Sequence, residues 1–372
     1  MKIAVDFTAG VRQPAGVGRY TRSLLRALAT APGAAHDLVL LWAGPARVPP
    51  PRDWPRTRTR ALPLPERWMT VAWHRLRLPL PADFLAGGAD VFYSPDFVLP
   101  PVARARGALT VHDLSFLTHP ETHYPPLRAY LERVVPRSVR RADLVLADSA
   151  HTKRDLVTLL GAPADKIEVV LSAADPAFTR VDDPQRLAAV QRRWGVGRPY
   201  VLSVGTIQPR KNLPVIFEAL RQLPRELTLV HVGNRGWLYE PVFEALERSG
   251  VKDRVRFLQG VDDADLAALY SGAVALVFPS LYEGFGIPCL EAMACGAPVI
   301  ASNAGSLPEV TGRAAIVVEP GDEAAIAAGI SRLLDDPAFR DSLVQRGYAQ
   351  AARFSWEDSG RRLLTLLHHL GR

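Results

Sequence analysis

The stretch FPSLYEGFGIPCLEAMACGAPVIAS, residues 278–302, decides the fold class of this chain. Together with the apolar run AVALV directly before it, its first residues predict a buried strand. A glycine-rich turn follows, and Pro288 fits one of the first positions of a helix. The backbone N–H groups of residues 284–287 should therefore point outward beside the positive end of that helix, where they would attract a diphosphate.

Two carboxylates flank this turn. Glu283 precedes the helix, and Glu291 lies eight positions later, inside it. Because an ionised carboxylate accepts hydrogen bonds and sugar hydroxyls donate them, the two glutamates can hold different parts of one sugar nucleotide without transferring a proton. The simpler interpretation is the strand, turn and helix of any α/β protein with two solvated glutamates, since a short glycine motif is not specific.

The segment YVLSVGTIQPRKNLPVIFEAL, residues 200–220, predicts a second strand, loop and helix. Arg210 and Lys211 stand just before this helix. Arginine supplies a planar fork and lysine a compact charge, and both stabilise the negative charge that grows on a leaving diphosphate. Arg210 alone could be an ordinary surface charge, because 40 of the 45 basic residues are arginine, but Lys211 is one of only five lysines.

The length and composition indicate two α/β domains. A chain of 372 residues with 48% apolar and 22% charged residues is too long for one ordinary core. The strands that start at residues 2 and 200 each open a series of strands alternating with helices, which predicts two doubly wound halves with the ligand between them. We interpret residues 173–198 as the connection between the halves.

The first half has two marks of a ligand site. Gly16 and Gly18 stand before an apolar-periodic helix, so a phosphate or a ligand oxygen could approach the backbone closely. This loop is not a dinucleotide fingerprint, because Thr21 stands in place of its third glycine. His112 directly follows a predicted strand, where it could donate to a sugar hydroxyl or serve as a buried structural histidine.

The positive charge is concentrated in the first half. Residues 1–180 hold 24 basic and 16 acidic side chains, and the segment from Arg47 to Arg77 combines eight arginines with three tryptophans. Such a segment suits an anionic membrane surface or a lipid-diphosphate acceptor, and an ordinary solvated loop is the alternative. No nucleic-acid module accompanies it, so we expect no nucleic-acid partner. The sequence contains no run of about 20 apolar residues, which a membrane-spanning helix needs. We therefore expect a cytoplasmic protein that can also contact the inner face of the cell membrane peripherally.

The string E-G-F-G-I-P followed by C-L-E-A-M-A-C-G-A-P-V-I-A-S resembles the signature of retaining glycosyltransferases of family 4, the glycosyl transferases group 1. The resemblance covers nearly the whole chain, and RADLVLADSAHTKRDL is similar to bacterial mannosyltransferase-type members. It implies a GT-B fold, an α/β architecture of two Rossmann-like doubly wound domains facing each other across a cleft. The implied domains are residues 1–175 for the acceptor, 176–355 for the nucleotide sugar, and 356–372 as a last helix that crosses back to the first domain.

The resemblance also implies roles for residues. His112, Arg210, Lys211 and Glu283 are the implied catalytic residues. In the family, the glycine-rich loop of the first domain faces the acceptor and the transferred sugar, Glu283 and the following turn hold that sugar, Glu291 holds the ribose, and Val261 lies near the base. The implied donor-binding set is Gly16, Gly18, Gly205, Thr206, Arg210, Lys211, Val261, Glu283, Gly284, Phe285, Gly286, Ile287 and Glu291.

The implied reaction moves a hexose from a nucleotide sugar to a hydroxyl of a glycan or lipid-linked glycan acceptor, with retention and with no metal or other cofactor. GDP-mannose is the favoured donor, and a UDP-sugar is the alternative. A non-catalytic sugar-nucleotide-binding protein or an epimerase of the same fold also stays open. Loss of turnover would be indicated by a missing Arg210, Lys211, Glu283 or Glu291, and all four are present.

Overall fold

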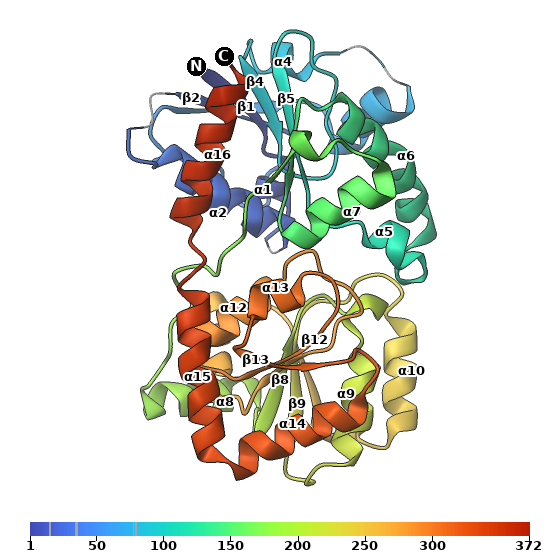
Figure 1. Ribbon diagram of the computed structural model, residues 1–372, viewed down its shortest axis with the longest axis vertical. Helices are drawn as coiled ribbons and strands as arrows, with labels where there is room; N and C mark the ends of the chain where they lie inside the picture. Colours follow the sequence, from blue (N-terminus) through green and yellow to red (C-terminus); the bar gives the residue numbers. More distant parts are fainter. Residues whose placement is uncertain (15, 34–35, 77, 79) are drawn as a thin grey trace. The chain divides into compact units, whose positions relative to one another are not determined.

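The computed structural model describes residues 1–14, 16–33, 36–76, 78 and 80–372, without the side chains of Glu66 and His74. Arg77, the end of the predicted basic segment, lies outside the described residues. The chain forms two compact units (Figure 1). The first contains residues 1–114, 129–172 and 355–372, and the second contains residues 115–128 and 173–354. This division differs from the domain boundaries expected from the sequence mainly in residues 115–128, which make their contacts with the second unit.

The first unit is built on a seven-stranded parallel sheet of order β3-β2-β1-β4-β5-β6-β7. The order reverses between β1 and β4, which makes this pair the topological switch point of a doubly wound sheet. The strands are β1 Lys2–Asp6, β2 Asp37–Ala43, β3 Thr57–Leu62, β4 Val91–Ser94, β5 Arg106–Val111, β6 Leu144–Ala147 and β7 Ile167–Val169. The helices are α1 Thr8–Arg12, α2 Val17–Ala29, α3 Glu66–Thr70, the π-helix η1 Val71–Arg75, α4 Ala82–Leu85, α6 Pro125–Arg141, α7 Ala150–Leu160, the 3₁₀ turn η3 Ala164–Lys166 and α16 Trp356–Leu370.

The second unit has a six-stranded parallel sheet of order β10-β9-β8-β11-β12-β13, with its switch point between β8 and β11. The strands are β8 Tyr200–Val204, β9 Thr228–Val232, β10 Val255–Leu258, β11 Leu276–Phe278, β12 Val299–Ser302 and β13 Ala315–Val318. The helices are α5 Ser115–Thr118, α8 Pro184–Trp194, α9 Leu213–Arg221, α10 Glu240–Ser249, α11 Asp263–Gly272, α12 Ile287–Ala294, α13 Leu307–Thr311, α14 Glu323–Asp335 and α15 Pro337–Ala351, with 3₁₀ turns η2 Pro120–Thr122, η4 Pro209–Lys211 and η5 Lys252–Arg254.

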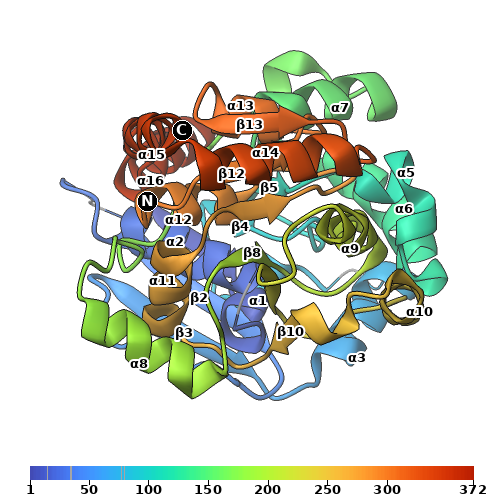
Figure 2. The ribbon, with the colours of Figure 1, turned by 90° about the horizontal axis from the view of Figure 1, so that it is seen from below.

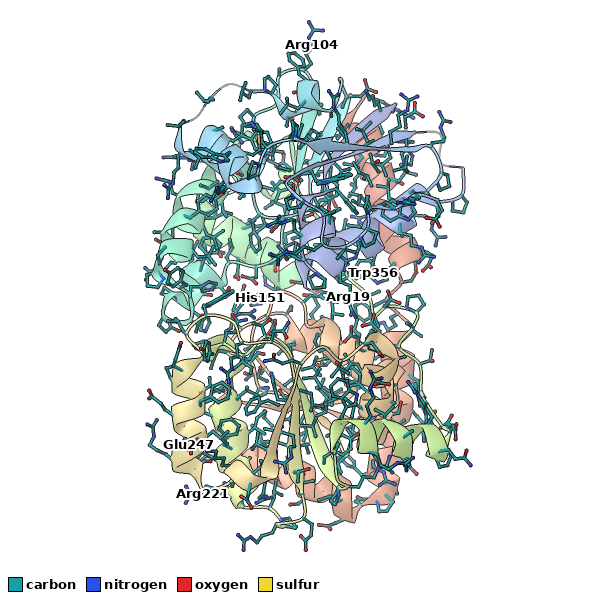
Figure 3. All side chains as sticks on the ribbon, turned by 180° about the vertical axis from the view of Figure 1, so that it is seen from behind. Arg19, Arg104, His151, Arg221, Glu247 and Trp356 are labelled. Atoms are coloured by element: carbon teal, nitrogen blue, oxygen red, sulfur yellow. The ribbon has the colours of Figure 1, made fainter. Side chains whose placement is uncertain are left out.

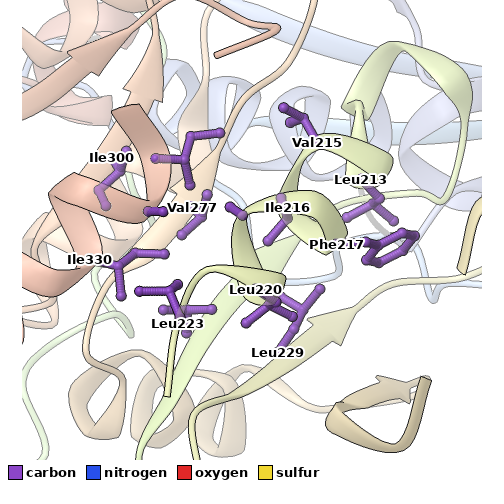
Figure 4. Packing of buried hydrophobic residues seen from close by; sticks show 14 of the residues in the cluster. Leu213, Val215, Ile216, Phe217, Leu220, Leu223, Leu229, Val277, Ile300 and Ile330 are labelled. Carbon is purple, nitrogen blue, oxygen red and sulfur yellow. The ribbon is translucent and has the colours of Figure 1, made fainter. Parts of the chain in front are cut away.

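A layer of buried apolar side chains covers one face of the second sheet. Leu213, Ile216 and Leu220 of α9 pack with Val277 of β11 and Ile330 of α14, and all five are fully buried (Figure 4). Figure 2 shows α8, α11 and α12 on the opposite side of this sheet from α9 and α10. Because both faces are covered, the strands read as continuous apolar runs, and for this reason the sequence predicts them well.

Three of the elements that the sequence does not predict are informative. Residues 57–62 form the edge strand β3, although arginine and threonine alternate there and most of it is exposed. The segment 173–198 is more than a connection, because it contains α8, which buries only Val190. Helix α8 is held instead by charge, since Arg186, Arg193 and the Trp194 indole all donate to the fully buried carboxylate of Asp265 at 2.7–2.8 Å. Helix α15 is the third, and it packs against α12.

The last helix belongs to the first unit. Helix α16 lies along α2 (Figure 1), and a side chain at Gly360 would come within 2.6 Å of the Ala27 backbone. The Ser359 hydroxyl donates to the Leu171 carbonyl oxygen at 2.6 Å, and Arg362 pairs with Glu168 at 2.6 Å. Trp356 is buried at its start, 5.9 Å from the ring of Tyr20 (Figure 3).

Candidate active site

The main cluster of predicted site residues lies at the switch point of the second sheet. Strands β8 and β11 pair there through Leu202 and Leu276. The loop after β8 carries Arg210 and Lys211, and the loop after β11 carries Glu283. Since both strands are parallel, their carboxyl ends meet at one edge of the sheet, which is where open α/β sheets bind ligands.

Arg210 and Lys211 each form an ion pair with Glu283. Lys211 Nζ lies 2.7 Å from Glu283 Oε1, and Arg210 Nη1 lies 2.9 Å from Glu283 Oε2. Lys211 Nζ also stands 4.5 Å from the centre of the Phe278 ring, and Arg210 donates to the Tyr282 carbonyl oxygen at 2.5 Å. The side chains of all three charged residues are less than 15% exposed. Contacts within the protein thus fix the positions of all three charged groups.

This cluster carries an excess of positive charge. Burial by itself raises the pKa of Glu283, but the charges of Arg210 and Lys211 outweigh it and lower that pKa to about 2. Burial lowers the pKa of Lys211, and the carboxylate of Glu283 opposes that effect. At neutral pH, two cations therefore face one carboxylate. The remaining charge suits an anion such as a diphosphate.

A second layer fixes the two loops. Asn212, in a left-handed conformation with φ 53°, donates its side-chain amide to the carbonyl oxygens of Pro279 and Pro320 at 3.1 and 2.6 Å. The Ser306 backbone N–H donates to the Glu283 carbonyl oxygen at 3.0 Å. A side chain at Gly305 would come within 2.3 Å of that same oxygen, so glycine is required for this close approach.

Gly205 stands between two buried basic groups. It has φ 140°, and a side chain there would come within 3.0 Å of the Lys211 stem. Its carbonyl oxygen lies 2.8 Å from His231 Nε2, and burial lowers the pKa of His231 to about 4. His231 is therefore neutral at pH 7 and donates to Gly205. Gly233 allows this packing, because a side chain there would overlap the Gly205 carbonyl oxygen.

The remaining residues of the predicted donor set surround this cluster. Gly286, with φ 104°, is the residue before α12, and Ile287 begins that helix, preceded by the buried residues Gly284 and Phe285. Glu291 lies inside α12 and is buried, and the Tyr270 hydroxyl donates to its Oε2 at 3.0 Å. Thr206 is exposed after β8, and Val261 is half-buried after β10.

Gly16, directly before α2, and Gly18, in the first turn of α2, shape the loop that leads into this helix. Gly16 has φ 58°, and a side chain at Gly18 would lie 2.0 Å from the Gln13 carbonyl oxygen. Arg22, one turn into α2, donates to the carbonyl oxygens of Gln13 and Pro14 at 2.7 and 2.6 Å. This loop follows β1 and α1, at the switch point of the first sheet. It is therefore a braced backbone turn in which Gly18 cannot carry a side chain.

His112 directly follows β5, as the sequence predicts, and both of its ring nitrogens have protein partners. Nδ1 lies 2.7 Å from Asp148 Oδ2, and Nε2 lies 2.9 Å from the Pro95 carbonyl oxygen. Burial lowers the pKa of His112, but Asp148 outweighs it, and the pKa rises to about 9. His112 is thus an imidazolium that donates to two protein acceptors. To contact a sugar hydroxyl it would first have to release Pro95.

The structure thus brings Arg210, Lys211 and Glu283 into direct contact and places Gly205 beside them. Gly16, Gly18 and His112 belong to the first unit. The sequence motifs do not identify six further residues of the site, which are Asn212, His231, Gly233, Gly305, Ser306 and Tyr270. The available signal for several of them was two glycine loops that each begin directly after a strand, GNRG at 233–236 and NAGS at 303–306. Among the described residues, no group of His, Cys, Asp and Glu is arranged to hold a metal ion.

Sequence comparison accounts for both halves of the chain. The family described as "Glycosyl transferases group 1" matches residues 187–350, and a "Glycosyl transferase 4-like domain" matches residues 15–172. The chain is 37% identical over 272 residues to O-antigen chain mannosyltransferase B of Escherichia coli, covering 72% of this chain and 71% of that protein. The chain belongs to the glycosyl transferases group 1 family. The resemblance drawn from the 278–302 stretch is therefore confirmed, and the protein is a glycosyltransferase.

Two further comparisons bear on this glycosyltransferase. It is 31% identical over 258 residues to serotype-specific mannosyltransferase WbdA of E. coli, a match that covers 67% of this chain but only 31% of that longer protein. The structure of Anabaena Alr3699/HepE in complex with UDP and glucose superimposes with a TM-score of 0.75 over 99% of both chains at 20% identity. That likeness shows the fold, and the predicted GT-B fold class is confirmed.

Proposed function

We propose that this glycosyltransferase transfers mannose from GDP-mannose to a hydroxyl of a glycan or lipid-linked glycan, with retention at the anomeric carbon. The observation that carries the proposal is the buried cluster of Arg210, Lys211 and Glu283, which keeps an excess positive charge at the switch point. The choice of mannose rests on the two mannosyltransferase relatives.

The proposed chemistry uses the cluster to stabilise a leaving group. As the bond from the anomeric carbon to the diphosphate breaks, negative charge grows on the diphosphate, and the two cations beside Glu283 stabilise it. The acceptor oxygen forms the new bond on the same face of the sugar, and its proton passes to the leaving phosphate. Because Glu283 is ionised and held by two cations, we assign it to positioning of the cations and the sugar rather than to proton transfer. In this scheme no metal or other cofactor is needed.

A UDP-sugar is the second candidate donor. HepE, which shares the fold, is described in complex with UDP and glucose. The residues that distinguish guanine from uracil would lie around Val261, after β10, and Glu291 would hold the ribose of either nucleotide. The two donors would bind the same phosphate site, but they would differ in the affinity that their bases contribute. Nucleotide affinities therefore distinguish them.

Calorimetric titration of the purified chain tests this choice. GDP-mannose, GDP, UDP-glucose and UDP are titrated in buffer with a chelator and no divalent metal. We expect the guanine pair to bind at least tenfold more tightly than the uridine pair. We also expect Glu291→Gln to weaken GDP binding, whereas Glu247→Gln, on the exposed face of α10 (Figure 3), leaves it unchanged. Preference for uridine ligands would reject mannose transfer from GDP-mannose, and no binding of any nucleotide would reject the donor site.

We also propose that the enzyme works at the inner face of the cell membrane, touching it through the basic segment that begins at Arg47. Arg58 and Arg60 are exposed on the edge strand β3, and Trp68 is 55% exposed on α3. Within the described residues, no helix is both long and apolar enough to cross a bilayer. Binding to phosphatidylglycerol vesicles at low salt tests the contact, and it should fall when Arg58 and Arg60 are replaced by glutamine.

A further inference from the structure

A cavity in the first unit carries three arginines that the donor site does not use. Its volume is about 560 Å³, within the range of small-molecule sites. Arg12, Arg67 and Arg75 line it together with the hydroxyl residues Thr70 and Tyr130, and two prolines and a valine complete the lining. None of these described lining residues is acidic, so the lining has a net positive charge.

The cavity lies at the ligand-binding edge of the first sheet. Arg12 ends α1, which follows β1, and Pro45 and Pro65 come shortly after β2 and β3. The Arg12 guanidinium donates to the Pro45 carbonyl oxygen at 3.3 Å, which connects these two parts of the wall. The carboxyl ends of parallel strands share one edge of a sheet. The cavity therefore lies at the same edge as the Gly16–Gly18 loop and His112.

The wall that carries Arg67 and Arg75 has an unusual backbone. Helix α3 continues into the π-helix Val71–Arg75, and the Leu76 N–H donates to the Val71 carbonyl oxygen at 2.8 Å, five residues back. Short π-helical turns occur frequently at functional sites. The Trp73 indole N–H donates to the Leu80 carbonyl oxygen at 2.8 Å and ties the following chain to this turn. Arg67 and Arg75 themselves are exposed, so a ligand can reach their guanidinium groups.

Apolar side chains stand next to these arginines. Among the described residues, nine large hydrophobic side chains are exposed, and six of them fall between residues 64 and 84. Leu64, Trp68 and Leu76 are each at least 50% exposed and are chain neighbours of the cavity residues Pro65, Arg67 and Arg75. A cationic cavity whose lining residues have exposed apolar neighbours along the chain fits a ligand that has an anionic head and a hydrocarbon tail.

We infer that this cavity binds the diphosphate of a lipid-linked acceptor, with its hydrocarbon chain against the exposed side chains of Leu64, Trp68 and Leu76. Arginine forks hold diphosphate oxygens in pairs, and three of them match a group that carries two or more negative charges. The inference rests on the proposed function, because it identifies the class of acceptor that this glycosyltransferase uses. The same chemistry would be offered by the phosphate headgroups of a bilayer, and the test separates the two sources.

Titration with farnesyl diphosphate, a short-chain probe kept below its micelle concentration, tests the site in the full chain. Excess GDP and UDP are present so that the donor site cannot take the probe. We expect the wild type to bind farnesyl diphosphate and not farnesol, and the variant Arg67→Gln/Arg75→Gln to bind at least tenfold more weakly. The control Arg133→Gln/Arg140→Gln removes the same charge from exposed positions on α6 and should bind as the wild type does.

Three results would overturn the inference. The control variant could lose as much affinity as the cavity variant, which would mean that only the overall charge matters. The cavity variant could bind as the wild type does. Farnesyl diphosphate could fail to bind while phosphatidylglycerol vesicles bind through Arg67 and Arg75, which would assign the arginines to bilayer headgroups. Nucleotide titration of the same variants reports separately on the donor site, so a failure of the proposed function would be recognised by itself.

Discussion

At the residue scale, the decisive interaction joins Glu283 to two cations that lie 72 and 73 positions before it in the chain. The sequence identifies Arg210, Lys211 and Glu283 by their motifs, but it does not show that the two cations bind that glutamate directly. These contacts form because β8 pairs with β11, which brings the buried side chains to N–O distances of 2.7–2.9 Å. No local sequence pattern encodes that pairing. For the same reason, the bond between His112 and Asp148 could not be predicted.

Replacing Lys211 by methionine should affect turnover far more than stability. Removal of one preorganised donor at a developing charge typically lowers turnover by about 100-fold or more. Glu283 keeps Arg210 at 2.9 Å, so we expect the free energy of unfolding to fall by only about 1–3 kcal/mol. Transfer kinetics and urea unfolding measure the two effects. Lys252→Met, which breaks an exposed pair with Glu247, should change neither, and wild-type turnover in Lys211→Met would remove Lys211 from the mechanism.

The His112–Asp148 pair should make the protein less stable in alkali. The pKa of His112 is raised from 6.5 to about 9 in the folded state, so its contribution is complete below pH 6.5 and is lost as the pH rises through 9. The loss is on the order of 3 kcal/mol at most. Urea unfolding at pH 6.5 and 9.5 should show this loss in the wild type and in His369→Asn, an exposed control, but not in His112→Asn. An equal loss in all three proteins would refute the ion pair.

At the scale of elements, the sequence predicts those parts whose pattern is set by burial. Strands β8, β9, β11 and β12 are mostly apolar and buried between two helical layers. The edge strands β10 and β13, which are only partly buried, occupy residues 255–258 and 315–318, where the sequence also predicts strands. Strand β3 is not predicted, because its arginines and threonines form an edge strand with no buried face. Helix α8 is not predicted, because it buries a single apolar residue. These elements are held by pairing with β2 and by the Asp265 carboxylate, which are long-range effects.

Alanine at Gly16, directly before α2, and at Gly18, in the first turn of α2, should separate two causes of instability. Gly16 faces open space with φ 58° and ψ −130°, so Gly16→Ala should cost only the penalty of this sparsely populated backbone conformation, about 1–3 kcal/mol. Gly18→Ala should cost more, because the added carbon would lie 2.0 Å from the Gln13 carbonyl oxygen and the loop braced by Arg22 must move. Gly197→Ala, with open space and no positive φ, should be neutral or slightly stabilising. Thermal unfolding ranks the three, and equal costs at residues 16 and 18 would contradict the packing of this loop.

At the scale of the whole molecule, each unit contains a buried histidine that resists protonation. His36 directly precedes β2 in the first unit, and His231 lies inside β9 in the second. Burial is the largest cause in both cases, aided by His368 next to His36 and by Lys211 next to His231, and it lowers each pKa to about 4. The two units therefore carry the same sensitivity to acid in separate cores.

Both units should lose stability between pH 6.5 and pH 4. In this range the unfolded histidines bind protons that the folded ones cannot, so the free energy of unfolding falls as the pH falls. Each histidine contributes on the order of 3 kcal/mol at most. Thermal unfolding at half-unit pH steps should show the midpoint falling in the wild type, with a flatter dependence in His36→Gln/His231→Gln. Replacing His151 and His369 instead removes two histidines that are not fully buried and should leave the wild-type dependence. If the two double variants gave the same curve, carboxylates rather than His36 and His231 would govern the acid response of this glycosyltransferase.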